Sequence, residues 1–244
     1  MTPAFPPLPW LTGLVALPCA EGRLLHARFD PEGFEPSLFA ALGVALPDSL
    51  HSALPKRQAE FLAGRALARL ALLQSGATQT HIPIGSDRAP VWPPGFSGSL
   101  SHARGHAACL VRQGPALVGA DVETLLQGNA LRAVRQLSCT ASDRALIDAA
   151  GWPEGALETL VFSAKETLFK LLYPVVRRHF GFAAARLVAP PEAGLITLAL
   201  TETLHPDLPQ GRPFALHFRL CEDHVLSWAT LPATSAFAKP AGSG

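Results

Sequence analysis

The sequence of 244 residues predicts an α+β fold, and three observations support this prediction. Apolar residues recur at helical spacing from Lys56 to Gln74 and again from about Ala156 to Val176. Short segments of strand-like composition stand on both sides of each helical stretch. The order strands, helices, strands therefore occurs twice, and we expect two subdomains, residues 1–123 and 124–244.

The first half is expected to open with an irregular proline-rich segment, Thr2–Pro9, followed by strands and two helices. A long amphipathic helix from Lys56 to Gln74 should end just before Gly76. Residues 82–101 are rich in Gly and Pro and predict turns. The other expected elements are strands Leu11–Leu17 and Arg23–Phe29, a short helix Ser37–Leu42, and a hairpin of His106–Arg112 with Leu117–Glu123.

The second half is expected to place its long helix between two short helices and a set of strands. The last two strands should form a hairpin that turns at Glu222-Asp223-His224. The expected elements are short helices Leu131–Leu137 and Ser142–Ala149, the long helix, and strands Ala185–Ala189, Leu195–Leu200, Phe214–Cys221 and Val225–Thr230.

Composition excludes several classes of protein. A formal net charge of +1 argues against a general nucleic-acid binder, which would carry a strong basic excess. None of the four cysteines stand at CxxC spacing, so neither a zinc knuckle nor a dithiol redox motif is present. No apolar run reaches the ~20 residues that span a bilayer, and no basic residue precedes the apolar stretch Trp10–Leu17. We expect a cytoplasmic protein that binds no membrane.

The long helix of the second half carries charges on a mostly apolar cylinder. Ser163, Glu166, Thr167 and Lys170 share one narrow polar stripe, whereas Lys165 lies among apolar neighbours. A buried charge costs several kcal/mol unless it is paired, so these groups need a second acid, a metal or a polyanion. The simpler alternative is a Glu166–Lys170 surface pair worth ~0.3–0.5 kcal/mol.

A second candidate is the segment Val118-Gly119-Ala120-Asp121-Val122-Glu123. Side chains alternate along a strand, so Asp121 and Glu123 point to the same face. Their carboxylates suit Mg²⁺, which completes its shell with water and substrate phosphates. A D-x-E pair that merely ends a strand is the alternative.

A third candidate is Gly98-Ser99-Leu100-Ser101-His102, where small residues allow a ligand to approach the backbone closely. His102 could donate to a phosphate oxygen, or it could be an ordinary turn histidine. The pair His102 and His106 has zinc-ligand spacing only in a helix, which the sequence does not predict there. Gly95-Phe96-Ser97-Gly98-Ser99 misses the last glycine of a serine-hydrolase elbow.

Taken together, these motifs resemble the 4′-phosphopantetheinyl transferases, most closely the monomeric surfactin-type group in the branch of enterobactin synthetase component D. The resemblance rests on Lys56-Arg57-x-x-Glu60-Phe61-x-x-Gly64-Arg65, Arg88-x-Pro90-x-Trp92-Pro93, Gly98-Ser99-x-Ser101-His102, Gly119-x-Asp121-x-Glu123 and Phe162-Ser163-x-Lys165-Glu166-x-x-x-Lys170. It implies two pseudo-twofold-related subdomains with the active site at their interface. It also implies transfer of 4′-phosphopantetheine from coenzyme A to a serine of an apo carrier protein, with release of 3′,5′-ADP.

The resemblance assigns roles at the matching positions. Asp121, Glu123 and Glu166 would hold Mg²⁺, with Glu166 or a metal-bound water as the base and Lys170 at the reacting phosphates. The coenzyme A contacts would come from Arg57, Arg65, Arg88, Ser101, His102, Lys165 and Lys170, with Lys56 as an alternative to Arg57. The departures are Ala120, where many relatives carry Ile, and Phe162, where many carry Trp. Two rivals remain: a coenzyme A- or nucleotide-binding protein without transferase activity, and a Mg²⁺-dependent phosphohydrolase.

Overall fold

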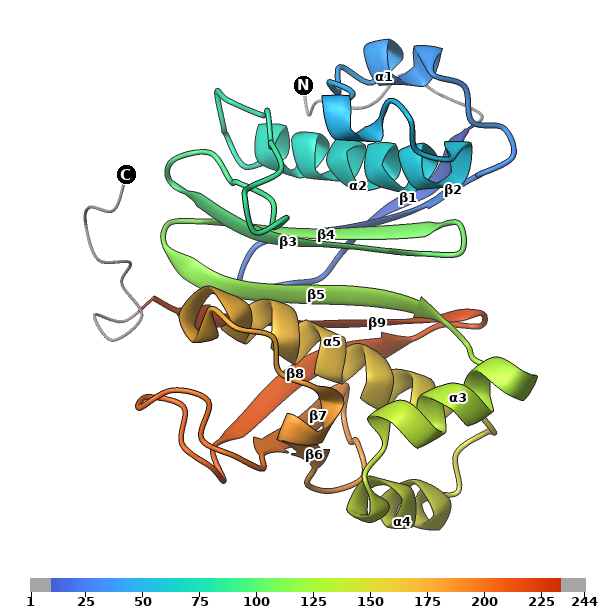
Figure 1. Cartoon of the computed structure of the whole chain (residues 1–244), viewed down its shortest axis with the longest axis vertical. Helices are drawn as coiled ribbons and strands as arrows, with labels where there is room; N and C mark the ends of the chain where they lie inside the picture. The colour runs from blue at the N-terminus through green and yellow to red at the C-terminus, as the bar shows by residue number, and fades with distance from the viewer. Residues whose placement is uncertain (1–9, 234–244) are drawn as a thin grey trace.

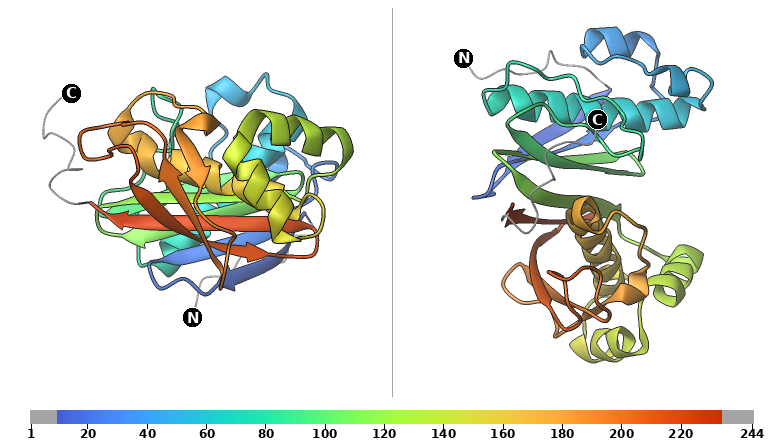
Figure 2. Two further views of the ribbon diagram at one scale, coloured as in Figure 1. Left: turned by 90° about the horizontal axis from the view of Figure 1, so that it is seen from below. Right: turned by 60° about the vertical axis from the view of Figure 1, so that its left-hand side comes forward.

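The computed structural model describes residues 10–233 and contains two antiparallel sheets, each covered by one long helix (Figure 1). The first sheet has the order β1-β2-β4-β3 and the second the order β5-β9-β8-β7-β6. The sheets stack on one another, with the two long helices on the outer faces (Figure 2). This arrangement confirms the predicted α+β class.

The first sheet packs against α2, Pro55–Gln74. Alternate residues of β2, such as Leu25 and Ala27, point toward this helix, and the leucines of α2 meet them in a core without solvent access. Pro55 at the first turn suits the start of the helix, because its missing N–H has no intrahelical partner there. The other elements of this half are β1 Leu11–Leu17, β2 Arg23–Phe29, α1 Ser37–Ala41, a 3₁₀ turn Asp48–Leu50, β3 Phe96–Ala103 and β4 His106–Gln113.

The second sheet packs against α5, Ala156–Val176, which the sequence predicted at the same bounds. The short helix α4, Ala141–Ala150, begins at a reciprocal capping box between Thr140 and Asp143 and ends at Gly151 in the left-handed region. The remaining elements are β5 Ala116–Thr124, α3 Gly128–Ser138, a 3₁₀ turn Phe182–Ala184, β6 Ala185–Leu187, β7 Leu195–Leu200, β8 Pro213–Leu220 and β9 His224–Pro232.

The predicted hairpin between β4 and β5 is wrong. β4 lies between β2 and β3, whereas β5 pairs along its whole length with β9, from Ala116↔Pro232 to Thr124↔His224. Strands adjacent in sequence usually pair, but here β5 places Val118 and Val122 in an apolar layer between the two sheets. The chain therefore changes sheets between Gln113 and Ala116, while the division into residues 1–123 and 124–244 stays a prediction.

The expectation of turns throughout residues 82–101 also needs correction, because β3 begins at Phe96. Its small polar residues have low strand propensity but connect β3 to β5. Ser97 Oγ accepts from Ala116 N at 3.1 Å, and Ser99 Oγ accepts from Ala120 N at 3.0 Å. A Cβ at Gly98 would lie 2.6 Å from the Trp92 ring, so this position needs glycine. Side-chain bonds thus join the edges of two separate sheets.

The expected irregular segment Thr2–Pro9 lies outside the described residues. Within residues 10–233, no helix combines the length and the apolar character that crossing a membrane requires.

Candidate active site at the seam between the sheets

Close contact between α5 and β5 creates the candidate site. A Cβ at Gly119 would lie 2.2 Å from the carbonyl oxygen of Thr167, so glycine allows the helix to rest directly on the strand. On the same polar stripe, the hydroxyls of Ser163 and Thr167 bond to Ser227 Oγ of β9 at 2.8 and 2.6 Å. These bonds orient α5 about its axis, with Lys170 toward the seam between β3 and β5.

Asp121 is the centre of the site and is only 2% exposed. Its Oδ1 accepts hydrogen bonds from Ser101 Oγ and from Lys170 Nζ, both at 2.7 Å. Lys170 also donates to Ser101 Oγ at 3.0 Å and to the Ala120 carbonyl at 3.2 Å. β3, β5 and α5 each supply one member of this cluster, so predicted residues from three distant motifs do meet.

The second oxygen of Asp121, Oδ2, is buried and accepts no hydrogen bond from the described part of the chain. Its neighbours are also acidic. Burial, and then the charge of Asp121, raises the pKa of Glu123 to about 8, and the same two causes raise the pKa of Glu166. An unsatisfied carboxylate oxygen among mutually repelling acids fits a divalent cation, which would satisfy the oxygen and favour the charged forms.

His102 stands beside this centre, near the start of α2. Its Nε2 lies 3.1 Å from Arg57 Nη1, and its Nδ1 lies 3.7 Å from Glu60 Oε2. Burial lowers the pKa of His102, so the ring is largely neutral at pH 7 and accepts from Arg57. Arg57 is exposed and also forms an ion pair with Glu60 at 3.6 Å, so it brings one guanidinium group beside His102 on the first half of the molecule.

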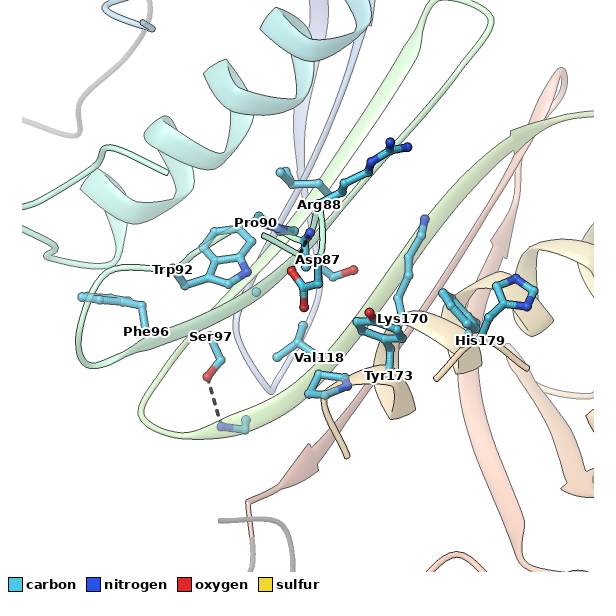
Figure 3. Close-up of a pocket in the computed structure, with 17 residues that line it drawn as sticks. Asp87, Arg88, Pro90, Trp92, Phe96, Ser97, Val118, Lys170, Tyr173 and His179 are labelled. Carbon is cyan, nitrogen blue, oxygen red and sulfur yellow. Dashed lines mark hydrogen bonds between the residues drawn. The ribbon is translucent and has the colours of Figure 1, made fainter. Parts of the chain in front are cut away.

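A cavity of about 580 Å³ opens next to Lys170. Figure 3 shows Trp92 and Phe96 on one side of it and Lys170, Tyr173 and His179 on the other. The walls are mostly apolar. Cationic groups border the cavity, including Arg88, which is exposed and holds a positive φ of 66° in its turn. The cavity therefore suits a long, partly apolar ligand with an anionic end.

His179 is a site residue that sequence reasoning missed. It follows α5 and lines the cavity. A positive charge on His179 lowers the pKa of Glu166 and so opposes the effect of burial and of Asp121. No motif marks it in the sequence, because only the reversal of the chain after Val176 returns this histidine to the helix. Its ring packs against Phe169, with ring centroids 5.3 Å apart.

The prediction that Lys165 contacts a phosphate is wrong. Its amine is 2% exposed and donates to Asp143 Oδ2 and to the Ser138 carbonyl, both at 2.7 Å. Successive residues on a helix diverge by ~100°, so Lys165 points toward α4 while Glu166 faces the acidic cluster. The partner of this buried lysine is therefore a second acid, one of the three possibilities that the sequence left open.

Arg65 lies in a smaller hollow of about 90 Å³, which it shares with Arg69 and His81. Its guanidinium stacks 4.8 Å from the Phe61 ring centre, and burial lowers its pKa to about 10. The structure thus separates Arg65 from the acidic cluster around Asp121. A phosphate contact by Arg65, and equally by Arg57, Arg88 or His102, stays a prediction.

Comparison with known proteins identifies the family. The model of the 4′-phosphopantetheinyl transferase N-terminal domain matches residues 46–112, and that of the 4′-phosphopantetheinyl transferase superfamily matches residues 117–229. Enterobactin synthase component D of Salmonella typhi is 34% identical over 180 residues, which cover 73% of this chain and 74% of that protein.

Two further relatives extend this comparison. The 4′-phosphopantetheinyl transferase Svp of Streptomyces mobaraensis is 32% identical over 150 residues, 61% of each chain. The transferase PptT of Mycobacterium tuberculosis is 31% identical over 167 residues, 65% of this chain and 67% of the relative. The two family models match residues 46–112 and 117–229, and the resemblance inferred from the motifs is confirmed: the chain belongs to the 4′-phosphopantetheinyl transferase superfamily.

Proposed function

We propose that this enzyme transfers 4′-phosphopantetheine from coenzyme A to a serine of an apo carrier protein and releases 3′,5′-ADP in a Mg²⁺-dependent reaction. The observation that carries the proposal is Asp121. One oxygen of this buried carboxylate bonds to Lys170, and the other has no partner among the described residues, beside two acids with raised pKa values. This arrangement matches a cation and a diphosphate bound together.

Asp121, Glu123 and Glu166 would hold the Mg²⁺ ion, which, when bound, neutralises charge that develops on the diphosphate. The amine of Lys170 lies at the mouth of the cavity and would exchange its bond to Asp121 for one to a phosphate oxygen. Ser101 holds the Asp121 carboxylate in place, since its hydroxyl donates to the same oxygen as Lys170.

The chemical step forms a bond from the carrier serine oxygen to the β-phosphorus of coenzyme A and breaks the bond from that phosphorus to the bridging oxygen. The serine proton must leave, and Glu166 is the proposed acceptor. Its carboxylate lies on the polar stripe of α5 beside Asp121, whose charge, after burial, raises the pKa of Glu166 while the metal is absent. The leaving diphosphate oxygen remains on 3′,5′-ADP, where Lys170 stabilises its charge.

The rest of coenzyme A would lie along the two neighbouring surfaces. The apolar walls around Trp92 and Tyr173 suit the pantetheine arm. Arg57 and His102 suit the 3′-phosphate, because guanidinium groups bind phosphate oxygens in pairs. Arg88 and Arg65 remain further candidates for that phosphate. The similarity to enterobactin synthase component D favours a carrier of siderophore or other nonribosomal peptide synthesis.

The test is a loading assay with coenzyme A, Mg²⁺ and a panel of apo carrier proteins, read by the intact mass of the carrier. Asp121→Ala and Glu166→Ala should abolish the mass gain, and chelation of Mg²⁺ should do so in the wild type. Glu202→Ala is the matched control, because this glutamate is exposed on a distant loop, and it should load normally.

Near-normal loading by either active-site variant would remove the metal site from the proposal. Binding of coenzyme A without mass gain on any carrier would favour a binding protein. Release of 3′,5′-ADP without any carrier would instead favour a phosphohydrolase.

A further inference from the structure

A cluster of three buried histidines lies apart from the acidic centre, between the two sheets. His26 comes from β2, His106 from β4 and His224 from β9. One ring nitrogen from each lies within 4.8 Å of those of the other two. The turns that join β3 to β4 and β8 to β9 lie at the same end of the molecule, which brings these strand ends together (Figure 1).

The position of the cluster follows from strand periodicity. Leu24, Leu110 and Leu226 belong to the apolar layer between the sheets, and side chains two residues apart share a face. On that same face, His26 lies two residues after Leu24, His224 lies two residues before Leu226, and His106 lies two residues before Ala108. Three imidazoles therefore close one end of a layer that is otherwise apolar.

We propose that His26, His106 and His224 form a Zn²⁺ site that ties the first sheet to the second. Histidine nitrogens bind zinc at ≈ 2.0–2.1 Å, which places neighbouring ligand nitrogens about 3.3 Å apart in a tetrahedral site. His26 Nε2 and His106 Nδ1 lie 3.1 Å apart in a hydrogen bond, which a shift of the His26 proton to Nδ1 would replace by two bonds to the metal. The nearest ligand pair thus has the spacing that the metal needs.

The free nitrogen of His224 is the second observation. His224 is 8% exposed, and its Nε2 is buried without a hydrogen-bond partner in the described residues. The other nitrogen, Nδ1, lies 2.7 Å from Asp223 Oδ1 and donates to it, since a carboxylate only accepts. The lone pair therefore remains on Nε2, where a metal would complete its bonding.

Asp223 also lies near a second ligand. Its Oδ2 lies 3.6 Å from His106 Nε2, which leaves His106 Nδ1 as the ligand atom. A carboxylate that holds the outer nitrogen of a metal-bound histidine is the usual outer partner in zinc sites. Arg28 forms an ion pair with Asp223, which offsets the charge of this arginine beside the cluster. On binding, His26 would carry its proton on Nδ1 and free Nε2 for the metal.

The histidines are also in the protonation state that metals require. Burial lowers the pKa of His26 to about 3 and that of His106 to about 4, and it lowers the pKa of His224 as well. Protons therefore do not compete with a metal near neutral pH. The rings of His26 and His224 stack with centroids 4.5 Å apart, and metal binding would spread this stack to aim both lone pairs at one point.

The test uses the full-length chain without a polyhistidine tag, stripped by a chelator and titrated with Zn²⁺ against a chromophoric competitor, with no Mg²⁺ or coenzyme A present. The wild type should bind one Zn²⁺, and Co²⁺ in its place should give the visible absorption of a tetrahedral site. Asp121→Asn should still bind one Zn²⁺, which separates this site from the catalytic one. His224→Asn and His26→Asn should lose it.

Two further variants complete the test. His205→Asn is the matched control, because His205 pairs with Asp207 outside the cluster, and its binding should be unchanged. Asp223→Asn keeps all three ligands and should weaken binding about 10- to 100-fold. Zn²⁺ at about 100 times its Kd should raise the wild-type Tm by about 5–10 °C. Absence of 1:1 binding, or equal binding by wild type and folded His224→Asn, would overturn the proposal.

Discussion

Replacement of Lys165 by methionine tests whether this lysine supports the fold or binds a ligand. The structure places its amine 2.7 Å from Asp143 Oδ2, and the two side chains are 2% and 0% exposed. Asp143 also accepts from the backbone N–H groups of Thr140 and Leu187, so its charge is held in the interior from three sides. Lys165→Met removes the cation of this ion pair and leaves that carboxylate buried.

Breaking a buried ion pair from one side costs about 3–5 kcal/mol, whereas loss of an exposed pair costs about 0–1 kcal/mol. The structure therefore predicts a decrease of about 3–5 kcal/mol in the free energy of unfolding and a fall in Tm of about 10 °C. Lys165→Met/Asp143→Asn, which removes both charges, should recover part of the loss. Arg186→Met, at an exposed basic position on β6, is the control and should change little.

The measurements are urea denaturation followed by tryptophan fluorescence, and carrier loading well below the Tm. Lys165→Met should keep kcat and the KM for coenzyme A within a few fold of wild type, because its amine does not reach the cavity. Lys170→Met should lower kcat/KM at least tenfold. An unchanged free energy of unfolding together with a large rise in KM would refute this account of Lys165.

Three other predictions concern the seam. Gly119→Ala should lower the free energy of unfolding in urea by about 1–3 kcal/mol or more, because the added Cβ would meet the Thr167 carbonyl. The control Gly64→Ala should not destabilise the protein, since a Cβ at Gly64 meets no other atom within 4 Å. His102→Ala should raise the KM for coenzyme A more than it lowers kcat, and an unchanged KM would reject its role. Glu123 has a pKa raised by burial to about 8, so the folded protein binds its proton more tightly than the unfolded chain. The contribution of Glu123 to stability without Mg²⁺ should therefore fall by about 2–4 kcal/mol from pH 4.5 to 8, measured as the difference between the pH profiles of the wild type and Glu123→Gln, because the buried histidines contribute to both profiles alike.

Much of the candidate site could be predicted from local pattern. The alternation of side chains placed Asp121 and Glu123 on one face, and the helical repeat placed Glu166 and Lys170 on one stripe. The structure brings Asp121 and Lys170 into direct contact. These residues lie on regular elements, where a short stretch of sequence determines which way a side chain points.

Other features depend on partners that are remote in the sequence. β3 could not be recognised from its small polar residues, because the partners of its serines lie on β5, in the other sheet. The partner of Lys165 could not be chosen, because Asp143 belongs to another helix. His179 returns to the site only through the chain reversal after α5.

The sequence by itself determined the α+β class, the two long helices and the face that each acidic or basic residue occupies, because these follow from repeats within a few residues. Only the tertiary structure decided which faces meet. It paired β5 with β9 rather than β4, directed Lys165 to Asp143 and gathered three histidines from three strands. The reason is physical. Periodicity sets the direction of a side chain on its own element, whereas the partner of that side chain depends on how separate elements pack. This dependence is strongest for buried charged groups, because a buried charge without a partner is strongly destabilising.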